Sequence, residues 1–124
     1  GGLVHAITCT PGPTPFDANV TFGASGGTPC SGNMVWIATS AVNAGQVPNG
    51  WLYGVNIAWA ELTWEIGLGA PFLGYLDPSG NYSSTITVFG LPCPLGIVLD
   101  GVALEFDVLT GGFVQGSTAL TSSL

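Results

Sequence analysis

The residues of this chain that could carry acid–base chemistry are carboxylates that have no basic partner. There is no lysine or arginine, and His5 is the single histidine. Each carboxylate must therefore be solvated, accept hydrogen bonds, bind a cation or become protonated. The acidic residues are Asp17, Glu61, Glu65, Asp77, Asp100, Glu105 and Asp107.

Two close pairs stand out among these acids. Glu61 and Glu65 would share one face of a short helix or of a strand, and Glu105 and Asp107 alternate along a strand. Paired carboxylates can hydrolyse glycosides or hold Ca²⁺ through oxygen ligands. A solvent-facing strand face already explains the second pair, however, and no loop has the dense Asp/Asn spacing of a calcium site. His5, near the terminus, is expected to face solvent or an interface. We therefore predict no enzymatic activity, no cofactor and no metal site.

Composition restricts the partners of this chain. A formal net charge of −7 without a basic patch cannot neutralise phosphates, which argues against nucleic acid and anionic membranes as partners. No apolar run reaches the roughly 18 residues of a membrane span. Yet mean hydropathy is +0.54 with only 6% charged residues. Burial between copies of the chain would accommodate this apolar excess, so we expect the chain to be its own partner.

Three cysteines and two glycosylation sequons suggest an oxidising, extracellular setting at the cell surface. Cys9, Cys30 and Cys93 allow one bridge plus one thiol, or a bridge between chains, and their spacing fits no zinc site. Cys9–Cys30 is slightly favoured, but the sequence leaves the pairing open. The sequons place candidate glycans at Asn19 and Asn81, although chance matches are equally compatible with the sequence.

Short apolar runs separated by glycine and proline predict an all-β fold. We expect a single β-sandwich of the jelly-roll or immunoglobulin-like kind, with about 8–9 short strands. Residues 1–10 form an N-terminal strand, residues 11–16 a proline-rich spacer and residues 17–124 the body. The strand could fold back as an edge strand, or it could be donated to a neighbouring subunit. The residues of this polymerisation strand are Leu3, Val4, His5, Ala6 and Ile7.

The body should contain further strands at 17–22, 34–39 and 51–57, and a helix or strand at 59–66. Residues 72–76 and 82–89 read as a hairpin around the turn at 77–81, where Pro78 and Gly80 favour turn geometry. Along 102–108, Val102, Leu104, Phe106 and Val108 should face the core while Glu105 and Asp107 face water. Residues 113–124 should form the last strand.

The pattern of residues 50–124 resembles a secreted β-domain found at the C-termini of planctomycete-type extracellular proteins. The matching parts are the turn 77–81, the strand 84–89, the Pro-Cys-Pro-Leu-Gly step at 92–96, the strand 97–107 and the Ser/Thr-rich end at 116–124. The resemblance implies a secreted all-β module. It transfers no catalytic residues.

We therefore expect a structural subunit of an extracellular filament or surface lattice, joined by β-strand exchange and apolar interfaces. The alternative is a carbohydrate-binding β-sandwich with glycans as partners, because aromatic rings can form a sugar-stacking platform, although burial in a core or interface would explain the same residues. The aromatic residues concerned are Trp36, Trp51, Tyr53, Trp59 and Trp64.

Overall fold

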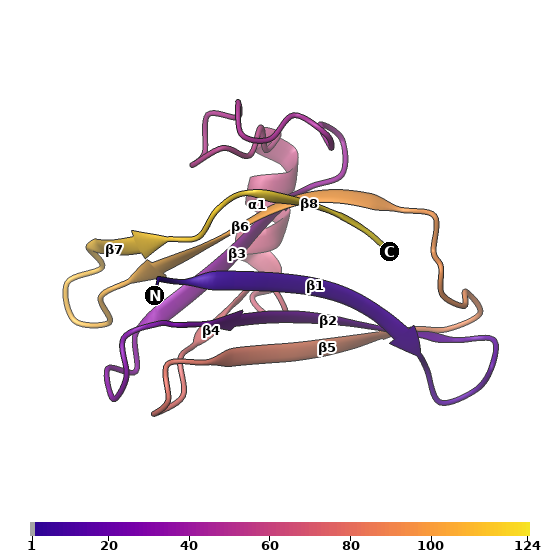
Figure 1. Ribbon diagram of the computed structural model, residues 1–124, viewed down its shortest axis with the longest axis horizontal. Coiled ribbons are helices and arrows are strands. Elements are labelled where there is room, and N and C mark those ends of the chain that lie inside the picture. Colours follow the sequence, from indigo (N-terminus) through magenta and orange to yellow (C-terminus); the bar gives the residue numbers. More distant parts are fainter. Residues whose placement is uncertain (1) are drawn as a thin grey trace.

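The computed structural model describes residues 2–124 and shows a mostly β protein with two sheets and one short helix (Figure 1). The predicted all-β class is confirmed at this level, while the sandwich type stays a prediction. The elements in chain order are β1 (Val4–Pro11), β2 (Ala18–Ser25), β3 (Met34–Ser40), α1 (Trp59–Leu68), β4 (Leu73–Tyr75), β5 (Tyr82–Val88), β6 (Val98–Phe106), β7 (Phe113–Gly116) and β8 (Leu120–Ser123).

The first sheet has the antiparallel strand order β1-β2-β5. Its side chains alternate as the sequence predicts, because Ile7, Val20 and Phe22 are buried while Thr8 and Thr85 are exposed. The outer face is rich in hydroxyl groups: Thr8 pairs with Thr21, and Thr21 pairs with Thr85 across the sheet. One face of this sheet is therefore dry and the other is uncharged but polar.

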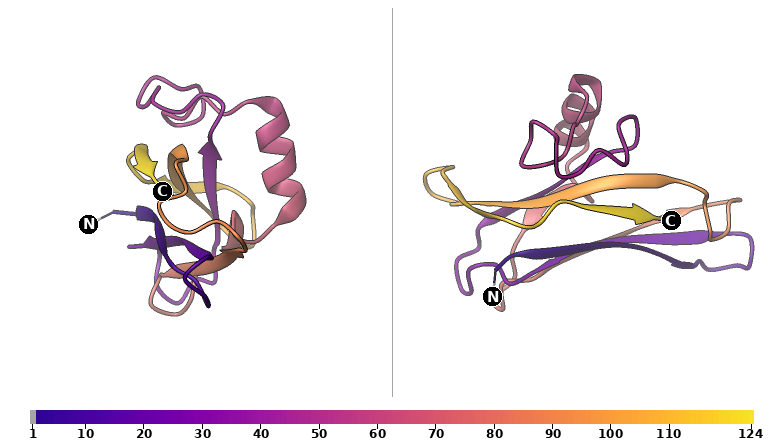
Figure 2. Two further views of the ribbon diagram at one scale, coloured as in Figure 1. Left: turned by 90° about the vertical axis from the view of Figure 1, so that its right-hand side faces the viewer. Right: turned by 45° about the horizontal axis from the view of Figure 1, so that its top comes forward.

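The second sheet has the order β4-β3-β6-β7, and β8 also pairs with β6. The two sheets lie over one another, and α1 lies outside them beside β3 (Figure 2). Phe22 of the first sheet meets Phe72, just before β4, with ring centroids 5.3 Å apart. The core between the sheets includes Ile7, Val20, Phe22, Val35, Ile37, Val102 and Leu104.

Three predicted elements were wrong. Residues 51–57 alternate like a strand but form a tight turn, because Tyr53 and Gly54 take positive φ values of 49° and 100°. The expected hairpin does not form, because β4 pairs with β3 and β5 pairs with β2, so the turn at 77–81 connects the two sheets. The single last strand is two strands, β7 and β8, which pair with successive parts of β6.

Residues 59–66 belong to a helix rather than a strand. The Ala58 N–H donates to the Glu61 carboxylate (3.2 Å), which closes the first turn, and Gly69 with φ 74° ends the helix. An acid in the first turn also suits the positive end of the helix dipole. Glu61 and Glu65 therefore lie one turn apart on one face, as the sequence predicts.

The N-terminal strand pairs with β2 of its own chain in this single copy. The expected spacer is a compact connection here, since the Gly12 N–H donates to the Asp17 carbonyl (3.0 Å) and the Asp17 N–H donates to that of Thr14 (3.1 Å). The accessible surface of 6321 Å² is close to the roughly 6,200 Å² expected for a folded monomer of this mass. Exchange of β1 between copies stays a prediction.

Candidate functional site

The residues of the predicted polymerisation strand divide between two environments. Leu3, His5 and Ile7 are buried in the core of their own chain, while Val4 and Ala6 face outward. His5 does not face solvent, which was one of the two expectations, and its place at an interface stays a prediction. Its Nδ1 lies 2.9 Å from the Ser117 hydroxyl, and burial lowers the pKa of its imidazole. His5 is thus buried between the two sheets, where its charged form is disfavoured.

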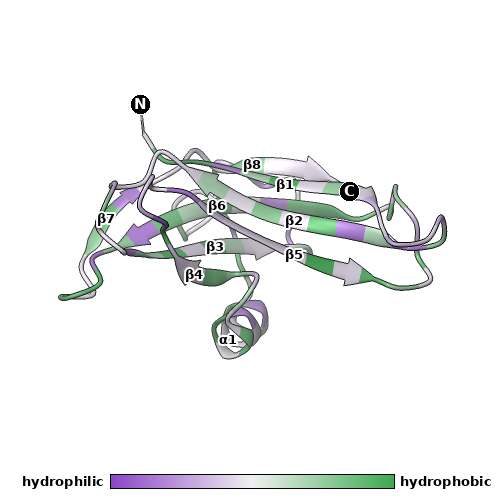
Figure 3. Cartoon of the chain, turned by 90° about the horizontal axis from the view of Figure 1, so that it is seen from below, coloured by the Kyte–Doolittle hydropathy of each residue, from purple (hydrophilic) through white to green (hydrophobic). Residues whose placement is uncertain are grey.

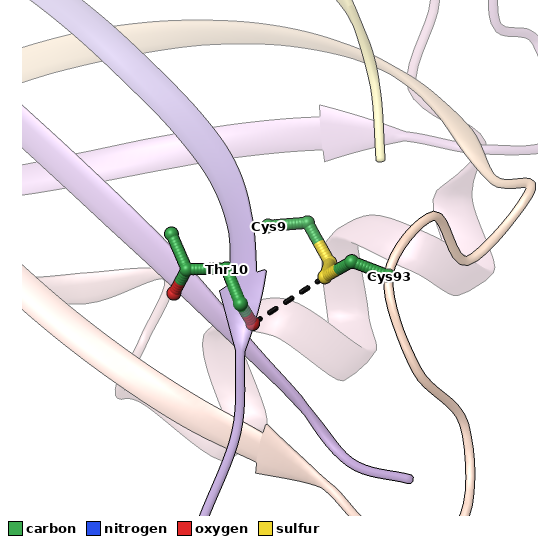
Figure 4. The surroundings of a disulfide bond; sticks show 3 residues. All are labelled: Cys9, Thr10 and Cys93. Atoms are coloured by element: carbon green, nitrogen blue, oxygen red, sulfur yellow. Dashed lines mark hydrogen bonds between the residues drawn. A yellow bond between two sulfur atoms is a disulfide. The ribbon is translucent and has the colours of Figure 1, made fainter. Parts of the chain in front are cut away.

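A disulfide joins Cys9 of β1 to Cys93 in the loop between β5 and β6 (Figure 4). The favoured Cys9–Cys30 pairing was therefore wrong, and the Cys30 thiol is exposed. The pairing of β1 with β2 places Cys9 near the end of the sheet, where the loop that contains Cys93 crosses it. Cys93 Sγ lies 3.4 Å from the Thr10 carbonyl oxygen. The sequence separation of 84 makes this bridge a tether between distant parts of the chain.

Glu61 and Glu65 of α1 cover a free edge of β3. The Thr39 N–H donates to Glu65 Oε1 (3.0 Å), and the Ala41 N–H donates to Glu61 Oε2 (2.8 Å). The Ile37 N–H, on the same edge, donates to the Phe72 carbonyl (2.7 Å). Carboxylates thus take the place of a neighbouring strand, and they protect the edge from pairing with another chain.

The two helix carboxylates differ in their protonation. Burial raises the pKa of Glu65 to about 7, and the nearby Glu61 charge adds to this, against the hydrogen bonds from Thr39. For Glu61, burial acts to raise the pKa. The hydrogen bonds from Ser40, Ala41, Ala58 and Val42 outweigh the effect of burial, so the net result is a lowered pKa. The arrangement therefore holds one ionised carboxylate beside one that titrates near neutrality.

The expectation that Glu105 faces water was also wrong. This side chain is fully buried and accepts hydrogen bonds from Asn33 Nδ2 and Gln115 Nε2 (both 2.7 Å) and from the Thr28 N–H (3.2 Å). Burial alone would raise its pKa, but hydrogen bonds led by that of Asn33 lower it. Asp107 instead closes the β6–β7 turn by accepting from the N–H groups of Leu109 and Thr110.

Asp100 is a structural carboxylate that the sequence reasoning missed. It is fully buried and accepts from the N–H groups of Gly45 (2.7 Å) and Gln46 (2.9 Å) and from the Thr121 hydroxyl (2.6 Å). Its position inside the apolar start of β6 was the available signal. Within residues 2–124, no group of three or more His, Cys, Asp or Glu side chains is arranged to hold a metal ion.

The aromatic candidates do not form one platform. Trp36 is buried, whereas the other four are at least half exposed. Trp51 and Trp59 pair with ring centroids 5.3 Å apart and planes inclined by 31°, while Tyr53 stacks on Phe113 at 4.7 Å. The Trp51 indole is fixed by its N–H, which donates to the Ile57 carbonyl (2.8 Å). The exposed pair Trp51/Trp59 is the part that could bind a sugar ring.

The two sequons lie in different surroundings. Asn81 is exposed at the end of the turn before β5. Asn19 lies in β2, the middle strand of its sheet, and its Oδ1 accepts a hydrogen bond from the Thr87 hydroxyl (2.8 Å). A glycan at Asn81 therefore needs no rearrangement, whereas one at Asn19 would disturb a cross-strand contact.

Large apolar side chains are exposed in the loops at both ends of the long axis. Figure 3 shows the hydropathy of the residues along the chain, including these loops. At one end, which we call the proximal end, Phe16, Phe89 and Leu91 are 72%, 74% and 57% exposed. The Gly90 N–H donates to Asp17 Oδ1 (3.0 Å), which holds these two loops together. Phe89 and Leu91 flank a glycine and Phe16 follows a proline, so apolar residues at turns were the signal that sequence reasoning passed over.

At the opposite end, the distal end, the β6–β7 turn exposes Leu109 (92%) and Val108 (48%). Val108 was expected to face the core, but β6 ends at Phe106, so it belongs to the turn. Gly111, which also belongs to this turn, lines an apolar groove of about 400 Å³. The remaining lining residues are Met34, Trp36, Ile66, Leu73 and Phe106.

In residues 2–124 there is no helix with the length and apolar character needed to cross a membrane. Comparison with protein-family models, curated proteins and solved structures finds no match to this chain.

Proposed function

We propose that this chain is a structural subunit of an extracellular filament or surface lattice that assembles with copies of itself through its apolar ends. The observation that carries the proposal is the exposure of Phe16, Phe89 and Leu91 at the proximal end and of Leu109 at the distal end. Exposed apolar groups gathered at specific places mark contact sites. The intrachain disulfide is consistent with an oxidising, extracellular compartment.

The two ends differ, so a contact between them is heterologous. Such a contact repeats into an open fibre unless its rotation closes a ring. Burying one such side chain contributes about 1.5–3 kcal/mol, so a few of them could hold neighbours together. With no lysine or arginine on the chain, ion pairs between subunits have almost no cation to draw on. Apolar contact is thus the main available attraction.

Exchange of β1 is the second joint in this proposal. Leu3, His5 and Ile7 would fill the same positions in a neighbour that they occupy in their own core, and residues 12–17 would act as the hinge. Domain swapping of this kind keeps every native contact except those of the hinge, so it adds a link at low energetic cost.

The end contact can be tested by negative-stain electron microscopy of variants at each end. We expect Phe89→Ser/Leu91→Ser to abolish filaments, and Leu109→Ser to do the same. Val42→Ser is the matched control, because Val42 is 73% exposed but lies at neither apolar end, and this variant should assemble normally. Filaments from both end variants would overturn the end contact.

Mixing the two end variants tests whether the contact joins unlike ends. Each variant keeps one working end, so an equimolar mixture should form species larger than either variant forms alone. Sedimentation velocity measures this difference. No increase in size on mixing would contradict a heterologous contact between unlike ends.

A carbohydrate-binding module is the second candidate function, and the exposed Trp51/Trp59 pair favours it. Stacking of a sugar ring on these indoles should shift tryptophan fluorescence on addition of a polysaccharide. Trp59→Ala should remove the shift, whereas Trp64→Ala should leave it, because Trp64 packs against Phe72 at 5.6 Å instead. No shift with a panel of neutral polysaccharides would exclude this candidate.

A further inference from the structure

β5 is the long edge strand that the fold leaves uncovered. Apart from its ladder with β2, no main-chain group of Tyr82–Val88 makes a hydrogen bond to any residue that the structure describes. The other edges are managed: the glutamates of α1 cover β3, and β4, β7 and β8 have three or four residues. β1, the other edge of the same sheet, is tied to the 93 loop by the Cys9–Cys93 bridge and by Cys93 Sγ at the Thr10 carbonyl oxygen (3.4 Å), and Gln115 binds Leu3 just before it.

The sequence of β5 also lacks the features that protect exposed edges. Natural edges are blunted by charged residues, proline or bulges. Tyr82-Ser-Ser-Thr-Ile-Thr-Val88 contains no charge and no proline, and its pairing with β2 runs without a register shift. Its inward-facing Ile86 is 41% exposed, so apolar surface accompanies the open edge. A strand of this kind is suited to pair with another strand.

We propose that β5 pairs antiparallel with β5 of a second copy, which makes one continuous six-stranded sheet. Centring the two-fold axis on Thr85 is the register that pairs all seven residues: Tyr82 with Val88, Ser83 with Thr87, Ser84 with Ile86 and Thr85 with itself. Hydroxyl residues then meet on the outer face, as Thr21 and Thr85 already do through their hydroxyls at 2.8 Å. Ile86 and Val88 lie on the inner side.

The self-complementary register and the neutral edge together point to a second copy as the occupant. Two copies that each carry −7 repel one another across most of their surfaces, but the β5 edge presents only neutral side chains. A self-complementary contact of this type closes as a two-fold dimer. It deepens the proposed self-assembly by adding a lateral contact, and it does not depend on the apolar ends.

Cysteine crosslinking tests the pair and its register. In a Cys30→Ser background, Thr85→Cys should form a covalent dimer on mild oxidation, because side chains directly opposite one another have Cβ atoms about 4.5–5.5 Å apart. Ser83→Cys is the matched control. In this register residue 83 lies opposite Thr87 of the other copy, so the two introduced cysteines are four residues apart along the strand direction, about 13 Å. Equal crosslinking of the two variants, or none of Thr85→Cys, would overturn the proposal.

A charge variant gives a second readout without new cysteines. In the Phe89→Ser/Leu91→Ser background the end contact is removed, so the β5 pair should remain as a dimer by sedimentation velocity. Adding Thr85→Lys places like charges opposite each other and should yield monomers, whereas Thr8→Lys, on the outer face of β1, should leave dimers. Dimers that persist with Thr85→Lys contradict the β5 pair. Filaments of wild type without Thr85→Cys crosslinking would leave only the end contact.

Discussion

Glu65 is the side chain whose protonation should most affect stability near neutral pH. Its pKa is raised from 4.5 to about 7 by burial, so the folded state favours the protonated form. The stabilisation is fully present below pH 4.5 and is lost as the pH rises through about 7. Glu65→Gln keeps the shape and an acceptor for the Thr39 N–H. We expect it to raise the unfolding free energy at pH 8 by about 1–3 kcal/mol and to change it little at pH 4.

Denaturant unfolding at both pH values checks this expectation. Burial lowers the pKa of His5, so its contribution to stability is lost as the pH falls, but wild type and variant share this contribution and it cancels in their comparison. Glu61→Gln is the control. Its pKa is lowered, so its ionised form contributes stability above pH 4.5 that is lost as the pH falls. Glu61→Gln should therefore destabilise the protein at pH 8. If both variants were equally destabilised there, the contrast between the two carboxylates would be wrong.

Glu105 is a fully buried carboxylate whose removal should leave several donors without their acceptor. Glu105→Ala would leave the buried Asn33 amide without its acceptor and would also remove the half-buried hydrogen bonds from Gln115 and the Thr28 N–H. Each unsatisfied buried donor costs about 1–3 kcal/mol, although water entering the cavity would recover part of this. We expect a loss of about 1–3 kcal/mol in unfolding free energy by denaturant titration. Asp107→Ala, in an exposed turn, should cost much less, and a similar loss in both variants would contradict the distinction.

At the scale of elements, the apolar runs located β1, β2, β3, β5 and β6 well, although only β1 and β2 alternate between a buried and an outward face, while β3 and β6 are buried on both faces and β5 is half-buried at most. They did not show which strand is central. Glu105 alternates like a wet position, but β6 pairs on both sides and the loop of Thr28 and Asn33 covers its outer face. Strand partners were equally hidden: β4 and β5 flank a turn, yet they belong to different sheets because β3 offers β4 a free edge.

The exposed ends could not be located from the sequence because the same residues also fit a core. Val108 continues the alternation of β6, and only the turn closed by Asp107 places it outside. The alternation at 51–57 failed for a related reason, since Gly50 and Gly54 permit a turn that periodicity does not detect. The topology of the fold therefore determines which apolar side chains stay exposed and are free to contact other copies.

The Cys9–Cys93 bridge should be a major stabiliser of the arrangement of β1. In the chain-entropy model, closing a loop of this length contributes about 4–5 kcal/mol, and observed values are typically about 2–4 kcal/mol. We expect Cys9→Ser/Cys93→Ser to lower the unfolding free energy by that smaller amount in denaturant titrations. Cys30→Ser should have little effect, because this exposed thiol forms no bridge. An equal effect of both changes would contradict the pairing.

At the scale of the whole molecule, self-assembly must overcome charge repulsion. Every copy carries −7 and no lysine or arginine, so salt can only weaken repulsion between copies and does not break attractive ion pairs. The Debye length falls from about 30 Å at 0.01 M to about 10 Å at 0.1 M salt. We expect assembly, measured by light scattering, to increase between these concentrations. Dissociation on adding salt would indicate attractive electrostatic contacts that this composition does not supply.

Strand exchange makes a prediction that depends on the order of oxidation and assembly. If the chain is oxidised as a monomer, the Cys9–Cys93 bridge locks β1 to its own body, and exchange is blocked. If the reduced chain assembles first, β1 can enter the neighbour, and oxidation then joins Cys9 of one copy to Cys93 of the next. Filaments made in this second way should give a ladder of covalent oligomers on a non-reducing denaturing gel. Filaments oxidised first should run as single chains.

The control for this experiment is the Cys30→Ser chain, which removes the exposed thiol as a source of accidental crosslinks. A ladder that survives in this variant must come from Cys9 and Cys93. Single chains from both orders of assembly would show that β1 remains with its own β2 in the filament. The apolar ends and the β5 edge would then be the joints: the ends offer exposed apolar side chains, and the β5 edge carries no charge.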